Sequence, residues 1–392
     1  MQRDSSKQSD VSVATRLSLF YIFFFINAGI YMPFWPVWLE SRGMGPFEIG
    51  LLFAVGRFAR VISSPMIAYG ADRLGTRRGP LLLLSGCTTA IFLLYHYCET
   101  VWQFAAVAAA VGMAWGTIMP LGDSLAIVNT QTRKIDYGRV RLWGSISFIL
   151  AAFAGGKMLE TAPEAAIFWV LIASFVSIFV VCGLLPNTRV ETEPVRMVGI
   201  WRLFAHPLFA LFMLCSALLQ TSHLVVYNYG TLHWRAAGVS DGVIGMLWAT
   251  GVIAEVILFA AGARFVDRLG PGRLFLAAAI AGVLRWTVLA YSTDLPVLFI
   301  VQTLHAFTFG AAHLAAMAFI GRAIPAYLSA TAQSLHGSVA LSVAAGVTAP
   351  FLGYLYEVFG GGAFHGMTLF SLAGGLCAVL LMRRWDGGKI VS

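Results

Sequence analysis

The sequence predicts an all-α integral membrane protein whose twelve transmembrane helices form two pseudo-symmetric six-helix bundles. Three observations predict this fold: an apolar composition, apolar stretches at regular intervals, and a long stretch of sequence that occurs twice. Hydrophobic residues make up 59% of the 392 residues, and charged residues make up only 11%. Soluble domains carry about twice that share of charged residues, so the chain is expected to lie in a lipid bilayer.

The apolar stretches are long enough to cross a membrane as helices. A helix needs roughly 20 residues to cross ~30 Å of hydrocarbon. Lipid offers no partner to free backbone groups, and the stretches lack the alternating pattern of barrel strands, so helices are expected. The expected spans cover about 17–38, 47–69, 80–98, 102–128, 140–159, 165–185, 208–232, 243–263, 274–292, 296–320, 328–350 and 364–382.

The basic residues predict the orientation of these spans. The loops on one side carry only Arg42, Lys157 and Arg235, and the other loops and both chain ends are rich in Lys and Arg. By the positive-inside rule, both termini are expected to be cytoplasmic. Because the basic residues follow membrane topology, the net charge of +8 does not indicate a nucleic-acid partner. We expect a multi-pass monomer in a plasma membrane, such as a bacterial inner membrane.

A long repeat divides the chain into two halves. Residues Ile49–Arg78 match Ile244–Arg273, 195 residues further on, at 14 of 30 positions without a gap. We therefore expect an N-terminal six-helix bundle over 1–185, a polar cytoplasmic linker over 186–206, and a C-terminal bundle over 207–392. Duplicated halves of this kind are typical of transporters that bind substrate near the bilayer midplane.

Two copies of a short motif lie at equivalent places in the halves. "GADRLGTRR" (70–78) resembles the signature loop of the major facilitator superfamily, and "VDRLGPGR" (266–273) resembles its second-half copy. Glycines permit a tight turn, and an aspartate can cap a helix or pair with a basic neighbour. We expect these loops to act as a conformational latch. Its residues are Gly70, Asp72, Arg73, Gly75, Asp267, Arg268 and Gly270.

A closer resemblance rests on three further stretches. "GDSLAIVN" (122–129), "DYGRVRLWGSISF" (136–148) and residues 285–317 resemble the phenylpropionate permease branch, and more distantly the lactose permease-type proton symporters. The resemblance implies that Arg141 pairs with Asp123 and binds substrate, and that Phe148 stacks on it. It also implies that Arg285 and His305 correspond to a basic residue and a histidine of the ninth and tenth spans.

The chain also departs from the lactose permease pattern. Gln302 stands where that branch has a lysine, and Thr308 stands where it has the proton-carrying carboxylate. Val252 occupies the acidic position of the eighth span, with Glu255 one turn away. Lactose is therefore not the expected substrate, and the proton relay must differ.

Polar side chains within the spans should face a cavity or a partner, because a charge there costs at least ~2.5–3.5 kcal/mol. Arg60 and Glu255 occupy equivalent positions of the two repeats, so we expect them on opposite sides of a central cavity. Histidine titrates near neutral pH and can relay a proton, although a buried histidine can also be a packing group. Both roles, proton relay and packing, remain open for His223, His305 and His313.

These observations predict a secondary transporter that imports a small organic solute with protons by alternating access. A carboxylate of the phenylpropionate type suits arginines and aromatic walls. A sugar or nucleoside symporter and a drug/proton antiporter remain alternatives. Expected substrate contacts are Asp123, Arg141, Phe148, Arg60, Arg285 and His223. Expected proton-coupling residues are Glu255, His305 and His313.

No enzyme or cofactor is expected. The chain has neither His-Glu-x-x-His nor Gly-x-Ser-x-Gly, the motifs of common metallohydrolases and serine hydrolases. The five cysteines are odd in number and lack the spacing of metal ligands, so no metal site is predicted. The proton gradient is the expected source of energy.

Overall fold

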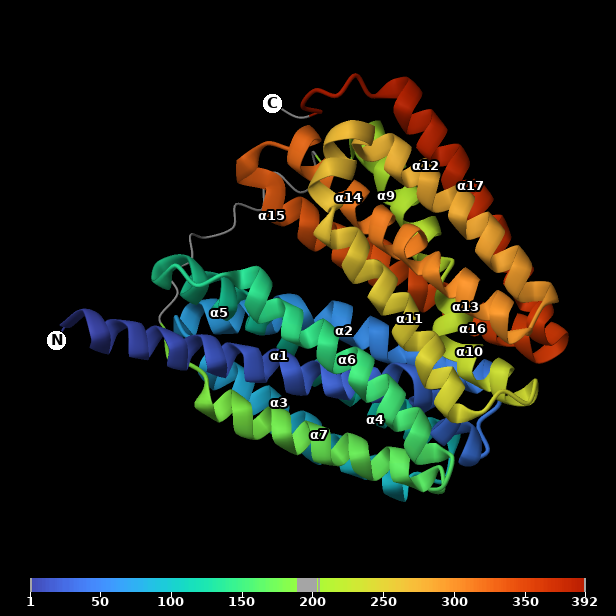
Figure 1. Cartoon of the computed structure of the whole chain (residues 1–392), viewed down its shortest axis with the longest axis horizontal. Coiled ribbons are helices and arrows are strands. Elements are labelled where there is room, and N and C mark those ends of the chain that lie inside the picture. Colours follow the sequence, from blue (N-terminus) through green and yellow to red (C-terminus); the bar gives the residue numbers. More distant parts are fainter. Residues whose placement is uncertain (1, 189–202, 204, 391–392) are drawn as a thin grey trace. The chain divides into compact units, whose positions relative to one another are not determined.

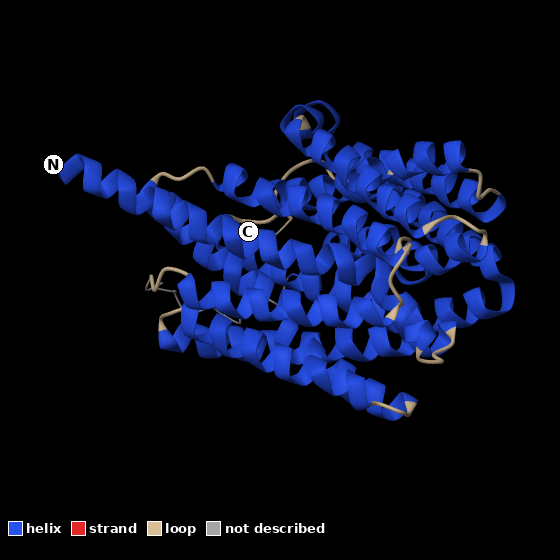
Figure 2. Ribbon diagram, turned by 60° about the horizontal axis from the view of Figure 1, so that its bottom comes forward, coloured by secondary structure: helices blue, strands red, loops and turns tan. Residues whose placement is uncertain are grey.

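The computed structural model describes residues 2–188, 203 and 205–390, and every regular element among them is a helix (Figure 2). Most of the predicted linker over 186–206 lies outside the described residues. The first half contains α1 (Gln2–Ser41), α2 (Pro46–Leu74), α3 (Arg78–Leu93), η1 (Leu94–Tyr97), α4 (Val101–Trp115), α5 (Ile118–Arg133), α6 (Tyr137–Leu159) and α7 (Ala165–Leu184). Within this half, α1 packs against α6 and α7 (Figure 1).

The second half repeats this series with more interruptions. It contains α9 (Pro207–Thr221), α10 (Leu224–Ala236), α11 (Asp241–Ala260), α12 (Gly262–Tyr291), α13 (Leu295–Thr303), η2 (Ala306–Ala311), α14 (Ala312–Ala323), α15 (Ala326–Leu335), η3 (His336–Val343), α16 (Ala344–Phe359), η4 (Gly360–Ala363) and α17 (Phe364–Arg384). Within this half, α12 packs along α17 (Figure 1).

Eleven helical runs among the described residues are long and apolar enough to cross a membrane, and the last of them contains two crossings. That run, Tyr327–Arg384, has 58 residues, which is about 87 Å of helix at 1.5 Å per residue. Gly360, with a φ of 53°, ends α16, and α17 begins after the short η4 turn. The described residues therefore make the twelve crossings that the sequence predicts.

Two of the predicted spans break near their middle. The fourth span consists of α4 and α5, and the seventh consists of α9 and α10. The tenth and eleventh spans each contain π-helical turns, η2 and η3. Such turns change the direction of the side chains that follow them and often occur at functional sites.

The structure divides into two compact units. The first comprises Met1–Met44, Val55–Glu193 and Ser240–Met246, and the second comprises Gly45–Ala54, Pro194–Val239 and Leu247–Ser392. Each unit thus includes a short segment from the other half of the sequence, namely the first turns of α11 and of α2. The predicted boundaries at 185 and 207 do not include this exchange, and they stay a prediction.

Glycines explain why the first turns of α11 belong to the first unit. A Cβ added at Gly156 of α6 would collide with the backbone carbonyl of Asp241, and one added at Gly245 would collide with that of Ala152. The Glu160 carboxylate accepts a hydrogen bond from the Gly242 backbone N–H. We call this contact between α6 and α11 the Glu160 clasp.

The second unit contains a matching contact between α16 and the first turns of α2. A Cβ at Gly353 would collide with the carbonyl of Pro46, and one at Gly50 would collide with that of Ala349. Glu357 Oε2 accepts from the Phe47 backbone N–H at 3.2 Å. We call this the Glu357 clasp.

The two clasps are equivalent under the sequence repeat. The shift of 195 residues that relates 49–78 to 244–273 takes Pro46 and Gly50 to Asp241 and Gly245. On the partner helices, a shift of 197 residues takes the Ala, Gly and Glu of one clasp to those of the other: Ala152, Gly156 and Glu160 become Ala349, Gly353 and Glu357. The duplication therefore preserves individual atomic contacts.

Candidate functional site

Arg285 lies at the centre of a buried polar cluster in the second unit. Its side chain projects from α12 and is 1% exposed. Its Nη2 donates to Gln302 Oε1 at 2.7 Å, and its Nη1 donates to Thr308 Oγ1 at 2.9 Å. Nη1 also lies 3.2 Å from His305 Nδ1. A guanidinium needs such partners when it is buried, because an ionised group without hydrogen bonds is costly to bury.

The direction of these hydrogen bonds determines the tautomer of His305. A guanidinium can only donate, so His305 Nδ1 must accept. The remaining ring proton of a neutral imidazole is then on Nε2, which lies 3.2 Å from Glu255 Oε2. A neutral His305 thus joins the Glu255 carboxylate on α11 to the guanidinium on α12.

A second histidine reaches the same cluster through Thr308. His223 Nδ1 lies 3.2 Å from the carbonyl oxygen of Gln220, so it must donate there. Its Nε2 therefore accepts from the Thr308 hydroxyl at 3.0 Å. The same hydroxyl oxygen accepts from Arg285, and this leaves each of these groups with a consistent role as donor or acceptor.

Helix interruptions bring these side chains together. His223 lies at the break between α9 and α10, and His305 directly precedes the π-helical turn η2, which contains Thr308. The rings of His305, Phe309 and His313 follow one another along one face of the tenth span, with interplanar angles of 13° and 6°. The predicted common face of His305 and His313 is present.

Two residues that sequence reasoning treated as departures from a family pattern are main partners of Arg285. Gln302 and Thr308 lie three residues on either side of His305, and both bond the guanidinium. Gln302 is itself held by a bond from its Nε2 to the carbonyl of Leu247 at 3.1 Å. The signal in the sequence was their helical spacing from His305, which places them near the same face.

The first unit holds a separate polar site around Asp123 of α5. Asp123 Oδ1 accepts from the Tyr21 hydroxyl at 2.6 Å and from the Tyr137 hydroxyl at 3.2 Å. The guanidinium of Arg141 lies over the ring of Phe25 at 4.2 Å and over that of Tyr21 at 5.4 Å. The sequence predicted Asp123 and Arg141 as substrate contacts, but it did not predict a role for Tyr21 or Tyr137.

The expected direct pair of Asp123 and Arg141 is absent. Among the described ion pairs of 4.0 Å or less, none joins these two residues. Tyr21 connects them instead, because its hydroxyl bonds Asp123 and its ring faces Arg141. Because the ring of Tyr21 lies between the two charged groups, the N–H groups of the Arg141 guanidinium remain available to another partner.

Phe148 and Arg60 occupy different environments. Phe148 is 6% exposed, at a point where its backbone lies against Gly29 of α1, so it is a packing residue in this conformation. Arg60 is exposed, and its aliphatic stem lies against Gly116, between α4 and α5. A Cβ at Gly116 would collide with that stem, so the glycine makes room for it. The expected position of Arg60 opposite Glu255 stays a prediction.

The latch motifs are helix ends rather than free loops. Helix α2 continues through Gly70, Asp72 and Arg73 to Leu74, and the turn occurs at Gly75, with a φ of 63°. Asp72 pairs with Arg77 at 2.5 Å. Gly70 was expected to permit the turn, but it lies within helix α2 and does not form it.

The second copy makes its turn at Gly270, whose φ of 71° interrupts α12. Asp267 and Arg268 are exposed there. Both copies thus use a glycine in the left-handed region, where other residues are strained.

No group of three or more His, Cys, Asp or Glu that could hold a metal ion occurs among the described residues.

Comparisons with known proteins agree with this architecture. A model of the MFS_1 like family matches residues 14–366. The chain is 32% identical over 368 residues to the "Probable 3-phenylpropionic acid transporter" of Escherichia coli (strain K12), with 91% of this chain and 94% of that protein covered. It is 26% identical over 383 residues to the maltose permease of Geobacillus stearothermophilus, with 94% and 95% covered.

Solved structures are similar in fold. The crystal structure of the nucleoside transporter NupG superposes with a TM-score of 0.82 at 14% identity, and the match covers 95% of this chain and 100% of that one. At this identity the likeness concerns the fold alone. The family match, the E. coli relative and the twelve crossings show that the chain belongs to the MFS_1 like family, and that it is a multi-pass secondary transporter of the major facilitator superfamily rather than an enzyme.

Proposed function

We propose that this transporter imports an aromatic acid of the phenylpropionate type together with a proton. The observation that carries the proposal is the series of the half-buried Glu255 and the buried His305 and Arg285, in which a carboxylate and a guanidinium contact opposite nitrogens of one neutral imidazole. The 32% identity to the probable 3-phenylpropionic acid transporter supports this substrate class. Bacterial relatives favour an inner-membrane location, and we place both termini in the cytoplasm and treat the protein as a monomer.

Arg285 is the proposed anchor for the substrate carboxylate. Its Nε has no hydrogen-bond partner among the described residues, although the side chain is 1% exposed. Arginine binds carboxylates through two parallel N–H groups, so this free edge can hold the acid end of a substrate. The rings of Tyr227 and Trp248, whose centroids are 6.1 Å apart, would cover its aromatic end.

Glu255 is the proposed proton carrier. When a carboxylate occupies Arg285, the guanidinium no longer holds His305 Nδ1, and a protonated Glu255 keeps the local charge balanced. When the substrate leaves, Arg285 returns to His305, and Glu255 releases its proton through the imidazole. Substrate binding and proton release thus both depend on the position of the Arg285 guanidinium. This shared dependence is the coupling that symport requires.

A binding screen tests the substrate class. Purified protein in nanodiscs would be titrated with 3-phenylpropionate, maltose and uridine, and binding would be measured by calorimetry. We expect saturable binding of the aromatic acid that is lost in Arg285→Lys, because lysine lacks the bidentate edge. Binding of maltose or uridine without binding of the acid would contradict the proposal.

The proton-coupling role has its own test in proteoliposomes. Glu255→Gln imitates the protonated carboxyl, so we expect it to bind and exchange substrate but to lose accumulation driven by a pH gradient. One proton moving with one carboxylate carries no net charge, so an imposed membrane voltage should not change the native rate. Accumulation by Glu255→Gln would assign coupling to another group, with Asp123 or His305 as the next candidates.

A sugar or nucleoside symporter is the second candidate, and the site around Asp123 favours it. Carboxylate, tyrosine hydroxyl and guanidinium groups next to aromatic rings suit the hydroxyls and apolar faces of a sugar. The maltose permease resemblance supports this alternative at 26% identity. The same titrations decide between the candidates.

A further inference from the structure

A short segment after α17, residues 385–390, is attached to the end of α14, and we call it the strap. In Figure 1 it is the red segment between α17 and the C-terminal label. Lys389 Nζ donates to the backbone carbonyl of Gly321 at 3.0 Å and to that of Ile324 at 2.6 Å. The last carbonyls of a helix have no partner within the helix, and a cation beside them also interacts favourably with the helix dipole.

Two further contacts attach the strap to the core of the second unit. The backbone N–H of Ile390 donates to the carbonyl of Ala323 at 2.9 Å. The ring of Trp385 lies 4.8 Å from that of Phe319, which is fully buried and stacks on Phe212 at 4.4 Å. Hydrogen bonds and a ring contact thus hold the end of α14 to the strap.

The strap has a defined conformation of its own. Asp386 Oδ1 accepts from the backbone N–H of Gly388 at 2.9 Å, and Trp385 Nε1 donates to the Gly388 carbonyl at 2.8 Å. Gly387 has a φ of 92°, a conformation that residues with a side chain rarely adopt. These contacts form a tight turn that places Lys389 beside α14.

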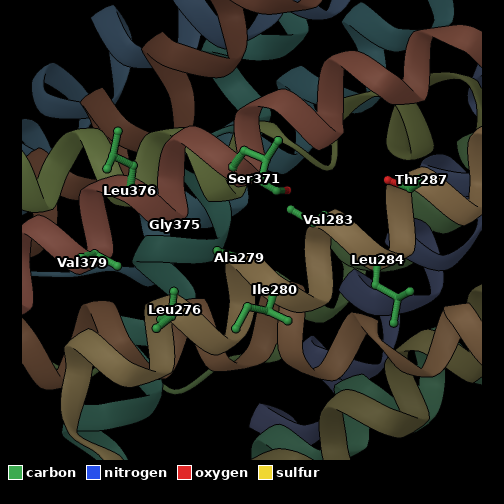
Figure 3. Close-up of a pocket in the computed structure, with 11 residues that line it drawn as sticks. Leu276, Ala279, Ile280, Val283, Leu284, Thr287, Ser371, Gly375, Leu376 and Val379 are labelled. Atoms are coloured by element: carbon green, nitrogen blue, oxygen red, sulfur yellow. The ribbon is translucent and has the colours of Figure 1, made fainter.

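The strap connects two different parts of the second unit. Helix α17 runs along α12, and its residues Ser371, Gly375 and Val379 line a pocket between these two helices (Figure 3). The strap follows directly after α17 and contacts the end of the tenth span. It therefore joins the twelfth span to the tenth.

Helix α14 is held by the strap at one end and adjoins a π-helical turn at the other. That turn, η2, contains Thr308, a partner of Arg285, and His313 lies in the first turn of α14. Helices change direction at such turns. The 12 residues of α14 make about 18 Å of helix, so α14 connects the buried polar cluster to the strap as one rigid helix.

The first half holds its fourth span in the same place. A shift of 195 residues takes Asn129, near the end of α5, to Ile324, and a shift of 197 residues takes Thr188 to Trp385. Thr188 follows α7, and its hydroxyl donates to Asn129 Oδ1 at 2.9 Å. In each half, the chain after the sixth span thus holds the end of the fourth. The first-half contact joins neutral groups, and the second-half contact uses the ammonium group of Lys389.

The strap can open without unfolding of the protein. Asp386, Gly387, Gly388 and Lys389 are exposed, so water competes for their hydrogen bonds. Solvent-exposed backbone contacts of this kind open locally at a much smaller cost in free energy than buried ones.

We propose that the strap controls the conformation of the tenth span. When the strap is closed, Lys389 holds the end of α14 in its present position. When it opens, α14 turns at η2 and moves Thr308 and His313 away from their present neighbours. Opening of the strap is therefore one step of the conformational change, and a closed strap slows that change.

Hydrogen exchange of the full-length protein in nanodiscs tests the strap without any substrate. Peptides that cover 320–324 and 385–390 report on it, because the N–H of Ile390 is bonded only while the strap is closed. Lys389→Ala should make both peptides exchange about 10-fold faster, the worth of one hydrogen bond to a charged group. Peptides of α12 should exchange as in the native protein, which separates a local opening from a loss of global stability.

Gly387→Ala tests the turn separately. A Cβ at this position meets nothing within 4 Å, so the variant acts through the positive φ alone, and exchange of the strap should again rise by about 10-fold. Lys389→Arg keeps a cation with hydrogen-bond donors, and Arg384→Ala removes a charge from an exposed position of α17 outside the strap. Both should exchange like the native protein. Native exchange rates in Lys389→Ala would overturn the proposal.

Counterflow of 3-phenylpropionate in proteoliposomes measures the effect on transport, and this measurement rests on the proposed function. Lys389→Ala and Gly387→Ala should speed counterflow by about 2- to 10-fold, because the strap no longer slows the conformational change. Lys389→Arg and Arg384→Ala should match the native rate. Faster exchange with unchanged or slower counterflow would show that the strap only stabilises a helix end, which would overturn its controlling role. Absence of counterflow in the native protein would instead contradict the proposed function, and the exchange rates would still decide whether the strap opens.

Discussion

The Glu160 clasp and the Glu357 clasp use the same three residue types at the same spacing, whereas the polar groups deeper in the two halves have no such correspondence. A shift of 195 residues takes Arg285 to Ala90 and Asp123 to Ala318, and it pairs Arg60 with Glu255. Close backbone contact accepts only very small side chains, so a duplicated packing contact keeps its residues. The ionisable groups belong to one half each, and they must be understood separately.

The two polar sites also differ in burial. Arg285 is 1% exposed, and its bonds go to side chains that are themselves buried, such as Gln302 at 2%. Asp123 and Arg141 are half-buried and share the ring and hydroxyl of Tyr21. Removing one partner of a buried charge costs much more than removing one from a partly solvated charge. Mutations in the second site should therefore affect stability, and mutations in the first should chiefly affect function.

The largest effect is expected for Arg285→Ala. The change leaves Gln302, Thr308 and His305 without their donor, and the free energy of unfolding should fall by at least about 1–3 kcal/mol, the cost of a buried polar group left unsatisfied. Chemical unfolding in detergent measures this loss, and uptake should be absent. Arg264→Ala, at an exposed arginine on the same helix, is the control and should unfold like the native protein. Equal stabilities of the two variants would contradict the comparison between the sites.

The sequence alone predicted the parts of this architecture that depend on composition and repetition. Hydropathy gave the twelve crossings, and the repeat gave the glycine turns at Gly75 and Gly270. The exchange of the first turns of α2 and α11 was not foreseen, because it depends on which backbones approach closely. That approach is visible only once Gly156 and Gly353 are placed against their partners.

The candidate site was predicted in part. The spacing of 20 residues between Arg285 and His305 indicated their proximity by family resemblance. The bridging role of Tyr21 could not be read from the sequence, because it depends on the rotation of α1 about its axis and on one side-chain rotamer. Gln302 and Thr308 carried no charge signal, so their hydrogen bonds to Arg285 became evident only from the geometry.

A smaller effect is expected in the first unit for Tyr21→Phe. The variant removes the shorter of the two bonds to Asp123, and a hydrogen bond to a charged group contributes about 1.5–3 kcal/mol. Because Asp123 and Arg141 are predicted substrate contacts, substrate affinity measured by calorimetry should fall by roughly 10-fold or more, since 1.4 kcal/mol corresponds to tenfold. Tyr137→Phe removes the longer bond and should have the weaker effect. The reverse order would mean that Asp123 changes its partner when substrate binds.

Asp123→Asn should abolish accumulation and leave the protein folded in the membrane, because the site is half-buried and the amide can still accept from Tyr21. Arg141→Ala should do the same. Counterflow and pH-driven uptake in proteoliposomes measure the two activities. Normal transport by both variants would contradict the prediction that Asp123 and Arg141 contact the substrate.

The clasps should respond alike to the same change. Gly50→Val and Gly245→Val each force a side chain against a backbone carbonyl, and overpacking of this kind typically costs about 1–3 kcal/mol. We expect similar losses of unfolding free energy in the two variants, since the contacts are equivalent. Gly70→Val is the control, because a Cβ there meets nothing within 4 Å. A loss in one clasp without a loss in the other would show that the duplication no longer preserves equal packing.

The smallest effect is expected for the carboxylates of the clasps. The pKa of Glu160 lies below the usual range for a carboxyl, chiefly because Lys157 Nζ donates to it at 2.9 Å and also because the Gly242 N–H does so. A lowered pKa means that the contribution of Glu160 is present above the ordinary carboxyl pKa of about 4.3 and is lost as the pH falls through the lowered value. Glu160→Gln should therefore be slightly less stable than the native protein at neutral pH and equal to it in strong acid. Lys157→Ala removes the main donor, so the same loss should begin at a higher pH, and a stability difference that does not change with pH would show that Glu160 acts by packing instead of charge.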